Sequence, residues 1–360
     1  MPVFSPDSTL LASWCDDLRV RIWHTSTGEL ASELEMQTEQ RTWLMFSPDG
    51  SRILSWVRDP TNAMFLTHFQ LWDPATGRLV STIHDDDSVD VSGGSFAFSP
   101  DGALFAAGEE YPRNSIRVWA TETGDRVAEL NGHDNSVICL AISPDGSYLA
   151  SGSRDRTVIL WDLRTHRPVA HSQGHVADVR FLLFHPDGEL LVLASSEGAI
   201  RLWDIRSEKI VSVLVGENET IADGAFSADG RYLCTSYGNG SVRVWDVESE
   251  RRTAFLGHTS FVYDVTFSPD GTEVASAAWD NTLLIHDVST GERVLRLVSN
   301  DEPLLGVAYS PDGTLIAASS SNHIYVWRLS DARRESPAPI LTIPNQGDNW
   351  YGRQSIGVAF

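Results

Sequence analysis

The chain has 360 residues, of which 42% are hydrophobic and 21% charged, so it has enough apolar side chains to bury a core and is not disordered as a whole. Its 27 basic and 49 acidic residues give a formal net charge of −22, which argues against nucleic acid as a partner because phosphate-binding surfaces need the opposite sign. No apolar run reaches the roughly 18 residues of a membrane-spanning helix, and three scattered cysteines (Cys15, Cys139 and Cys234) are too few for a disulfide framework or a paired-cysteine metal site.

A repeated pattern begins within the first residues of the chain. Residues 1–7 (MPVFSPD) carry no secretory signal, which predicts a cytoplasmic protein without a membrane partner, and they contain the first copy of a motif close to Phe-Ser-Pro-Asp-Gly. Eight copies follow one another at intervals of 42, 52, 44, 42, 42, 41 and 42 residues. They begin at Phe4, Phe46, Phe98, Ile142, Phe184, Phe226, Phe267 and Tyr309. This period indicates one supersecondary unit repeated along a single domain that covers residues 1–360.

Each copy predicts the same short elements in the same order. An apolar, β-branched stretch such as residues 262–267 predicts a strand, and Ser-Pro-Asp-Gly predicts a tight turn, because Pro presets φ and Gly allows positive φ. Residues 148–151 then predict a second strand, 153–156 a polar turn and 158–161 a third strand. A Thr-Gly turn introduces a fourth strand. No stretch has sustained helical periodicity, so the sequence predicts an all-β chain of four-stranded antiparallel β-propeller blades.

The dipeptides at fixed places in these copies resemble a known family. Trp-Asp pairs occupy residues 72–73, 161–162, 203–204 and 245–246, and Gly-His pairs occupy 132–133, 174–175 and 257–258. Over essentially the whole chain, this pattern resembles that of WD-repeat proteins. The resemblance implies a rigid β-propeller that serves as a platform for other proteins and is rarely an enzyme.

The resemblance also implies a buried tetrad that stabilises a blade by linking a Trp N–H through a Ser and a His to an Asp. One copy has all four residues in place, and they are His133, Ser151, Asp155 and Trp161. Three later copies depart from the pattern. His286 stands where the seventh copy would have Trp, beside His258, Ser276 and Asp280; Leu193 and Glu197 replace Ser and Asp in the fifth; and Glu217, Thr235 and Asn239 occupy the His, Ser and Asp positions of the sixth. We therefore expect blades of uneven stability.

Eight copies predict eight blades, with seven blades plus an extra repeat as the alternative. Residues 355–360 match a first strand with no blade after it. Such a strand either docks into the first blade and closes a ring, or belongs to a longer array that is cut within a repeat. Residues 57–68 and 329–354 are longer connections, which are either functional or disordered.

The sequence contains no recognisable catalytic motif. There is no phosphate-binding Gly-rich loop, no nucleophile elbow and no His-Glu-x-x-His pair, so we predict no catalytic residue, no cofactor and no metal. The acidic run at 85–87 with Asp90 lacks the alternating spacing and glycine of a calcium loop, which favours a solvated loop.

Candidate partner-binding residues lie in the loops before the first strand and in the turns between second and third strands, where WD-repeat proteins commonly receive partners. They are Arg154, Phe261, Trp279, Asp134, Asn135 and Thr259. Exposed aromatic and arginine side chains often anchor interfaces, but Trp279 and Phe261 are equally compatible with packing against a neighbouring blade.

Three functions fit these observations. The first is a non-catalytic, monomeric scaffold that binds other proteins or peptides, and the second is a regulatory or sensor region of a larger signalling protein. The third, a propeller enzyme with acidic residues around a central channel, has no motif in its support.

Overall fold

A computed structural model describes most of the chain. The described residues are 3–7, 9–15, 19–35, 43–58, 67–83, 95–172, 177–195, 198–215, 219–299, 302–320, 323–332 and 338–344. The chain divides into two compact units, the first made of Met1–Phe46, Asp73–Arg78 and Ala222–Phe360 and the second of Ser47–Trp72 and Leu79–Ile221.

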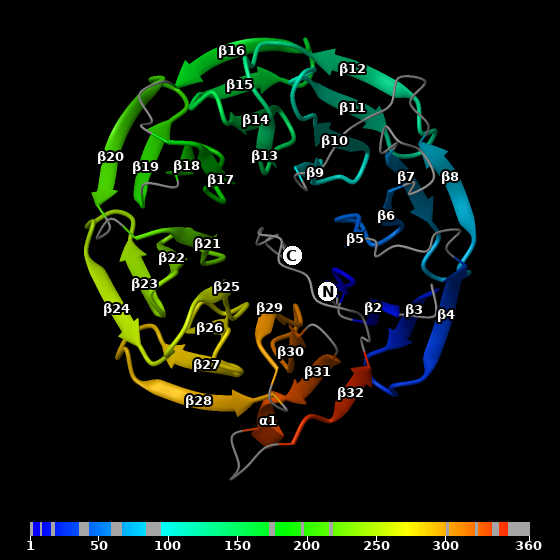
Figure 1. The fold of residues 1–360 in the computed structure, drawn as a ribbon, viewed down its shortest axis with the longest axis vertical. Helices are drawn as coiled ribbons and strands as arrows, with labels where there is room; N and C mark the ends of the chain where they lie inside the picture. Colours follow the sequence, from blue (N-terminus) through cyan, green and yellow to red (C-terminus); the bar gives the residue numbers. More distant parts are fainter. Residues whose placement is uncertain are drawn as a thin grey trace. The chain divides into compact units, whose positions relative to one another are not determined.

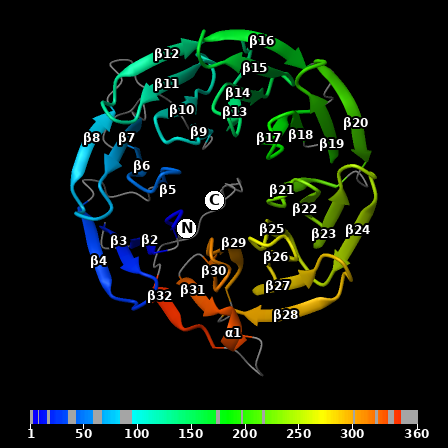
Figure 2. The same ribbon diagram turned by 180° about the vertical axis from the view of Figure 1, so that it is seen from behind.

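The described residues form eight four-stranded sheets, each built from four strands that follow one another in the chain (Figures 1 and 2). We number these sheets as blades 1 to 8. Blade 1 comprises β1 (Val3–Phe4), β2 (Leu10–Cys15), β3 (Arg19–His24) and β4 (Leu30–Glu35); blade 2 comprises β5 (Trp43–Phe46), β6 (Ile53–Arg58), β7 (Thr67–Trp72) and β8 (Leu79–Ile83). Blade 3 comprises β9 (Phe96–Phe98), β10 (Leu104–Gly108), β11 (Ile116–Ala120) and β12 (Arg126–Leu130); blade 4 comprises β13 (Val137–Ile142), β14 (Tyr148–Ser153), β15 (Val158–Asp162) and β16 (Arg167–Ser172).

The second half of the chain repeats this order. Blade 5 comprises β17 (Val179–Phe184), β18 (Leu190–Ser195), β19 (Ala199–Asp204) and β20 (Lys209–Val215); blade 6 comprises β21 (Ile221–Phe226), β22 (Tyr232–Tyr237), β23 (Ser241–Asp246) and β24 (Arg252–Leu256). Blade 7 comprises β25 (Val262–Phe267), β26 (Glu273–Ala278), β27 (Thr282–Asp287) and β28 (Arg293–Val298); blade 8 comprises β29 (Leu304–Tyr309), β30 (Leu315–Ser320), β31 (His323–Arg328) and β32 (Leu341–Pro344). The helix found in the described part of the chain is α1 (Leu329–Ala332), after blade 8.

The predicted all-β β-propeller of eight antiparallel blades is confirmed. All eight motif residues, from Phe4 to Tyr309, are the last residues of the first strands of their sheets. The expected closing strand, residues 355–360, lies outside the described residues, as do most of the long connections, so ring closure and a single domain stay predictions.

The turn after each first strand is held by the motif's own side chains. In blade 4, Ser143 Oγ donates to Asp145 Oδ1 at 2.6 Å and accepts from the Tyr148 N–H at 2.9 Å, while Gly146 has a φ of 72°. The hydrogen bond from Ser143 is the largest cause that lowers the pKa of Asp145. The Ser-to-Asp bond recurs in blades 1, 2, 3, 6, 7 and 8, which explains why this four-residue pattern marks the repeats.

Neighbouring blades within a unit pack through apolar faces. In the second unit, Val158 and Leu160 of blade 4 cluster with Phe184, Leu193 and Trp203 of blade 5. In the first unit, blade 8 packs on blade 1 in the same way, through a cluster that contains Phe4, Leu11, Ala308, Leu315, Ala317, Ile324 and Val326. No helix in the described residues is long and apolar enough to span a membrane.

Candidate functional site

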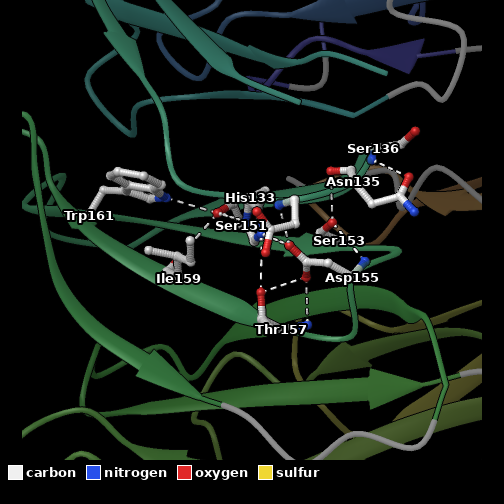
Figure 3. A network of polar contacts seen from close by, with 10 residues as sticks. His133, Asn135, Ser136, Ser151, Ser153, Asp155, Thr157, Ile159 and Trp161 are labelled. Carbon is white, nitrogen blue, oxygen red and sulfur yellow. Dashed lines mark hydrogen bonds and ion pairs between the residues drawn. The ribbon is translucent and has the colours of Figure 1, made fainter. Parts of the chain in front are cut away.

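Blade 4 connects the four tetrad residues in one chain of hydrogen bonds (Figure 3). The Trp161 Nε1–H donates to Ser151 Oγ at 2.8 Å, and Ser151 Oγ lies 2.8 Å from His133 Nε2. The other ring nitrogen, His133 Nδ1, lies 2.9 Å from Asp155 Oδ2. Because a carboxylate only accepts, a neutral imidazole carries its proton on Nδ1 and accepts the serine proton at Nε2. The chain therefore gives each of these buried groups a partner.

The Asp155 carboxylate also fixes the adjacent loop and turn. It accepts from the Asp134 N–H at 2.9 Å and from Thr157 Oγ1 at 2.6 Å. Burial alone would raise the pKa of Asp155, but the hydrogen bonds from His133 and Thr157 outweigh it and hold this pKa well below its usual range. The tetrad therefore joins the core of blade 4 to the loop that carries the candidate partner residues.

Three of those candidates lie together around this loop in the second unit. Asn135 Oδ1 accepts from the Ser136 N–H at 2.8 Å (Figure 3). The Arg154 N–H donates to the Ser136 carbonyl oxygen at 3.0 Å. The side chains of Asp134 and Arg154 are exposed, and Asn135 is half-buried. Backbone hydrogen bonds thus hold the polar side chains of this surface on a fixed framework.

The other three candidates lie on blade 7 in the first unit. The Trp279 N–H donates to the Phe261 carbonyl oxygen at 2.9 Å, so the turn and the loop are adjacent. Tyr263 lies between the two rings, with its ring centroid 4.8 Å from Phe261 and 5.8 Å from Trp279. Trp279 is 44% exposed, Thr259 is exposed, and Phe261 and Tyr263 are half-buried. We call Phe261, Tyr263 and Trp279 the aromatic cluster.

Comparisons with known proteins identify the repeat. Residues 92–255 match a family model described as the IFT122 first beta-propeller, and residues 249–287 and 291–328 match the model described as WD domain, G-beta repeat. The chain contains WD repeats. With these matches, the expected resemblance and the observed fold agree.

Several relatives share part of this WD-repeat chain. An intraflagellar transport protein 122 homolog of Xenopus tropicalis is 39% identical over 83 residues, 22% of this chain and 7% of the relative. A guanine nucleotide-binding protein subunit beta-5b of Danio rerio is 36% identical over 113 residues, 31% and 26% of the two chains. Periodic tryptophan protein 2 of Arabidopsis thaliana is 30% identical over 161 residues, 44% and 16% of the two chains. The WD-repeat chain thus spans about a quarter or less of these relatives.

Other blades of the WD-repeat chain have different residues and hydrogen bonds at the tetrad positions. In blade 7, His258 Nε2 lies 2.9 Å from Ser276 Oγ and Nδ1 lies 3.1 Å from the Asp280 carboxylate, but His286 takes the place of Trp. His286 is buried. Burial and, to a smaller degree, the nearby His258 lower the pKa of His286 to about 4, so this ring is neutral at neutral pH.

Blade 6 uses a tyrosine that the sequence reasoning missed. The Trp245 Nε1–H donates to Thr235 Oγ1 at 3.1 Å, and Thr235 in turn contacts the Tyr237 hydroxyl at 3.2 Å. The guanidinium of Arg243 lies 4.0 Å from the centre of the Tyr237 ring. Asn239 instead accepts from Ser241 within its own turn, while Glu217 lies outside the described residues. Tyr237 could have been recognised as an aromatic residue two positions after the Ser/Thr position.

Blade 8 has a Trp that lacks its acceptor. Ala318 occupies the Ser position, opposite Tyr325, and within the described residues the buried Nε1 of Trp327 has no hydrogen-bond partner. In blade 5, Leu193 is buried in the apolar cluster, and Glu197 lies outside the described residues, as does the Gly174–His175 pair.

The structure also reveals an exposed residue that the sequence reasoning missed. Tyr111 is 70% exposed, on the turn between β10 and β11, and its N–H donates to Ser136 Oγ at 3.0 Å. The buried pair of Glu109 and Arg117, 3.1 Å apart, lies at the base of this turn. The sequence does carry a signal for this longer turn, because Trp119 follows Phe98 by 21 residues whereas the interval is 19 in most copies.

No group of three or more His, Cys, Asp or Glu side chains is placed to hold a metal ion in the described part of the chain. The acidic run at 85–87 and Asp90 lie outside that part. The buried thiols of Cys139 and Cys234 are free, and burial is the main cause that raises the pKa of each, which makes them poor nucleophiles.

Proposed function

We propose that this chain is a non-catalytic protein-interaction scaffold, acting as a cytoplasmic monomer. WD-repeat propellers generally bind other proteins, and the matched families are generally non-catalytic. The observation that carries the proposal for this chain is the aromatic cluster of blade 7, where Trp279 leaves 44% of its surface exposed beside two further rings. Contiguous exposed aromatic surface on a rigid framework is typical of an interface anchor.

The partner chemistry that best fits this surface is a basic segment of another protein. The chain carries a formal charge of −22, so it attracts cationic partners over distances of about a Debye length. An arginine or lysine from the partner gains further from the face of an exposed tryptophan ring. The partner would therefore place a cationic side chain against Trp279 and aliphatic groups against Phe261.

A second contact region is proposed in the other unit, around Ser136. Tyr111 projects from a turn fixed by a buried ion pair, and Arg154 projects from the adjacent turn of blade 4. A rigid tyrosine loses little conformational entropy on binding, so it adds affinity efficiently. These two side chains, with Asp134 and Asn135, would contact polar groups of a partner.

The regulatory region of a larger signalling protein is the second hypothesis. It is favoured by the lengths of the relatives, of which the chain spans 7%, 26% and 16%. The same blade 7 surface would serve either function, because the two differ in what else the protein contains.

A binding measurement on the full chain tests the proposal. Two fluorescent peptides of equal length, one alternating Arg with Leu and the other Glu with Leu, are titrated with wild type and with Trp279→Ala. We expect the Arg peptide to bind more tightly, to weaken with added salt, and to lose about tenfold in affinity with Trp279→Ala, which corresponds to about 1.4 kcal/mol.

The matched control is Val169→Ala, because Val169 is also 44% exposed but lies on β16 of blade 4. This variant should bind as wild type does. Equal affinity for both peptides would contradict the basic-partner assignment, and an unchanged affinity in Trp279→Ala would contradict the aromatic cluster as the anchor.

A further inference from the structure

Two aspartates are buried between the first strands of blades 6, 7 and 8, in the first unit. Asp223 on β21 is 5% exposed and Asp264 on β25 is 3% exposed. Both occupy the same place in their repeats, three residues before the last residue of the strand. Burying an unpaired carboxylate is costly, so each needs hydrogen bonds or a proton.

Each aspartate reaches the backbone of the next blade. Asp264 Oδ2 accepts from the Val307 N–H of β29 at 2.8 Å, and Asp223 Oδ2 lies 3.5 Å from the Val265 N of β25, a long contact. The corresponding residue of blade 4, Cys139, also contacts the next blade, through its Sγ, 3.4 Å from the Val179 carbonyl oxygen. This position therefore faces the following blade, and only in blades 6 and 7 does it carry a carboxyl group.

The two carboxyl groups also contact each other. Burial is the largest cause that raises the pKa of Asp264, followed by repulsion from Asp223 and a hydrogen bond to it. Burial raises the pKa of Asp223 as well, whereas its hydrogen bond with Asp264 works in the opposite direction. Two carboxylates in contact cannot both remain charged in a buried site, so a proton between them is favoured.

We propose that Asp223 and Asp264 hold one proton between them, and that this protonated pair joins the first strands of blades 6, 7 and 8. With Asp264 as the donor, its O–H bonds to the Asp223 carboxylate while its other oxygen accepts from the Val307 N–H. The acidic proton and the Val307 N–H then both have an acceptor, and only one negative charge is buried.

One member of the pair, Asp264, directly follows Tyr263 of the aromatic cluster along β25. A bulge in β25 leaves Tyr263 as the extra residue between Val262 and Asp264, so the aromatic cluster and the acid pair share one irregular stretch of backbone. Loss of the proton places two charges in contact, and their repulsion loosens β25 against its neighbours. The position of Tyr263 then depends on the protonation of the pair. The pair itself does not depend on the proposed binding function.

Few other titratable groups face the pair. One of them is the buried thiol of Cys234 on β22. Burial is the main cause that raises the pKa of this thiol, and the charges of both aspartates raise it further. Arg243 on β23 is held over the Tyr237 ring. The remaining titratable residues on β22, β23, β25, β26 and β29 stand at or next to strand ends, and they are Tyr232, Tyr237, Asp246, Tyr263, Glu273 and Tyr309.

Hydrogen exchange of the full chain tests the proposal without any partner. Protection of the peptides that cover β25 and β29 is measured from pH 6 to 9 in wild type, Asp264→Asn and Asp264→Ala. Asparagine mimics the protonated acid, because its amide donates to Asp223 and its oxygen accepts from the Val307 N–H. We expect wild-type protection to fall relative to Asp264→Asn by up to about tenfold per pH unit as the proton leaves. Asp264→Ala should be poorly protected throughout.

The matched control is Asp270→Asn, because Asp270 belongs to the same blade but lies in the exposed turn after β25. Its pH profile should follow wild type. An infrared band of a protonated carboxyl group should be present in wild type and Asp270→Asn and absent in both Asp264→Asn and Asp223→Asn. Parallel pH profiles for wild type and Asp264→Asn, or an unchanged infrared band in both single asparagine variants, would overturn the proposal.

Discussion

Replacing His133 by alanine removes the middle link of the blade 4 tetrad. Ser151 is partly rescued, because its hydroxyl also lies 3.3 Å from the Ile159 carbonyl oxygen, and Trp161 keeps its acceptor. Asp155 loses the imidazole but keeps the donors of its own turn. A hydrogen bond to a charged group contributes about 1.5–3 kcal/mol, and the vacated ring leaves a cavity. Because of the partial rescue, we expect the free energy of unfolding to fall by about 2 kcal/mol.

Urea denaturation followed by circular dichroism measures this loss, and hydrogen exchange of residues 148–162 shows whether it is local to blade 4. His171→Ala is the control, since His171 is an exposed histidine on β16 of the same blade and its removal should change stability by less than about 0.5 kcal/mol. If the two alanine variants shift the urea midpoint equally, the tetrad does not stabilise the blade and the reasoning is refuted.

Two further predictions concern blades with incomplete tetrads. Because the pKa of His286 is lowered from 6.5 to about 4, the unfolded chain binds a proton in this range that the folded chain does not, so stability present above pH 6.5 is lost as pH falls toward 4. The free energy of unfolding should fall by about 3 kcal/mol between pH 6.5 and 4 in wild type, and by less in His286→Phe. Urea titrations that give the same fall for both proteins would contradict this prediction. In blade 8, Ala318→Ser should give the Trp327 Nε1–H an acceptor and raise the free energy of unfolding by about 1 kcal/mol. A lower melting temperature for Ala318→Ser would contradict the assignment of Ala318 to the Ser position of the tetrad.

The fold could be predicted from the sequence because its signals are local. The motif residues end the first strands without exception, since the side chains of Ser-Pro-Asp-Gly make the turn's hydrogen bonds themselves. The blade 4 tetrad was predictable through the resemblance to WD-repeat proteins, because His133 and Trp161 stand at the positions that the family's pattern gives them. Interactions between residues close in sequence recur in each blade, so they are visible as a repeated pattern in the sequence.

The candidate surfaces were only partly predictable, because they depend on contacts between residues in different elements. The resemblance to WD-repeat proteins, applied by position in the repeat, indicated Trp279 and Phe261 but left out Tyr263, whose placement depends on the bulge in β25. Tyr111 was missed because its exposure comes from a two-residue lengthening of one turn. The acid pair was missed since Asp223 and Asp264 are about one repeat apart and look unremarkable until neighbouring strands bring them together.

Blade 7 shows why stability and binding need not draw on the same residues. Its tetrad position holds the small ring of His286 where blade 4 buries the whole indole of Trp161, while a tryptophan, Trp279, is exposed in its turn. A blade with less buried aromatic surface needs other contacts to keep its first strand in place. The acid pair supplies such contacts, because Asp264 ties β25 to the backbone of β29 at the point where the bulge begins. The strand that carries Tyr263 is thus held by a contact to the next blade, which does not require Trp279 to be buried.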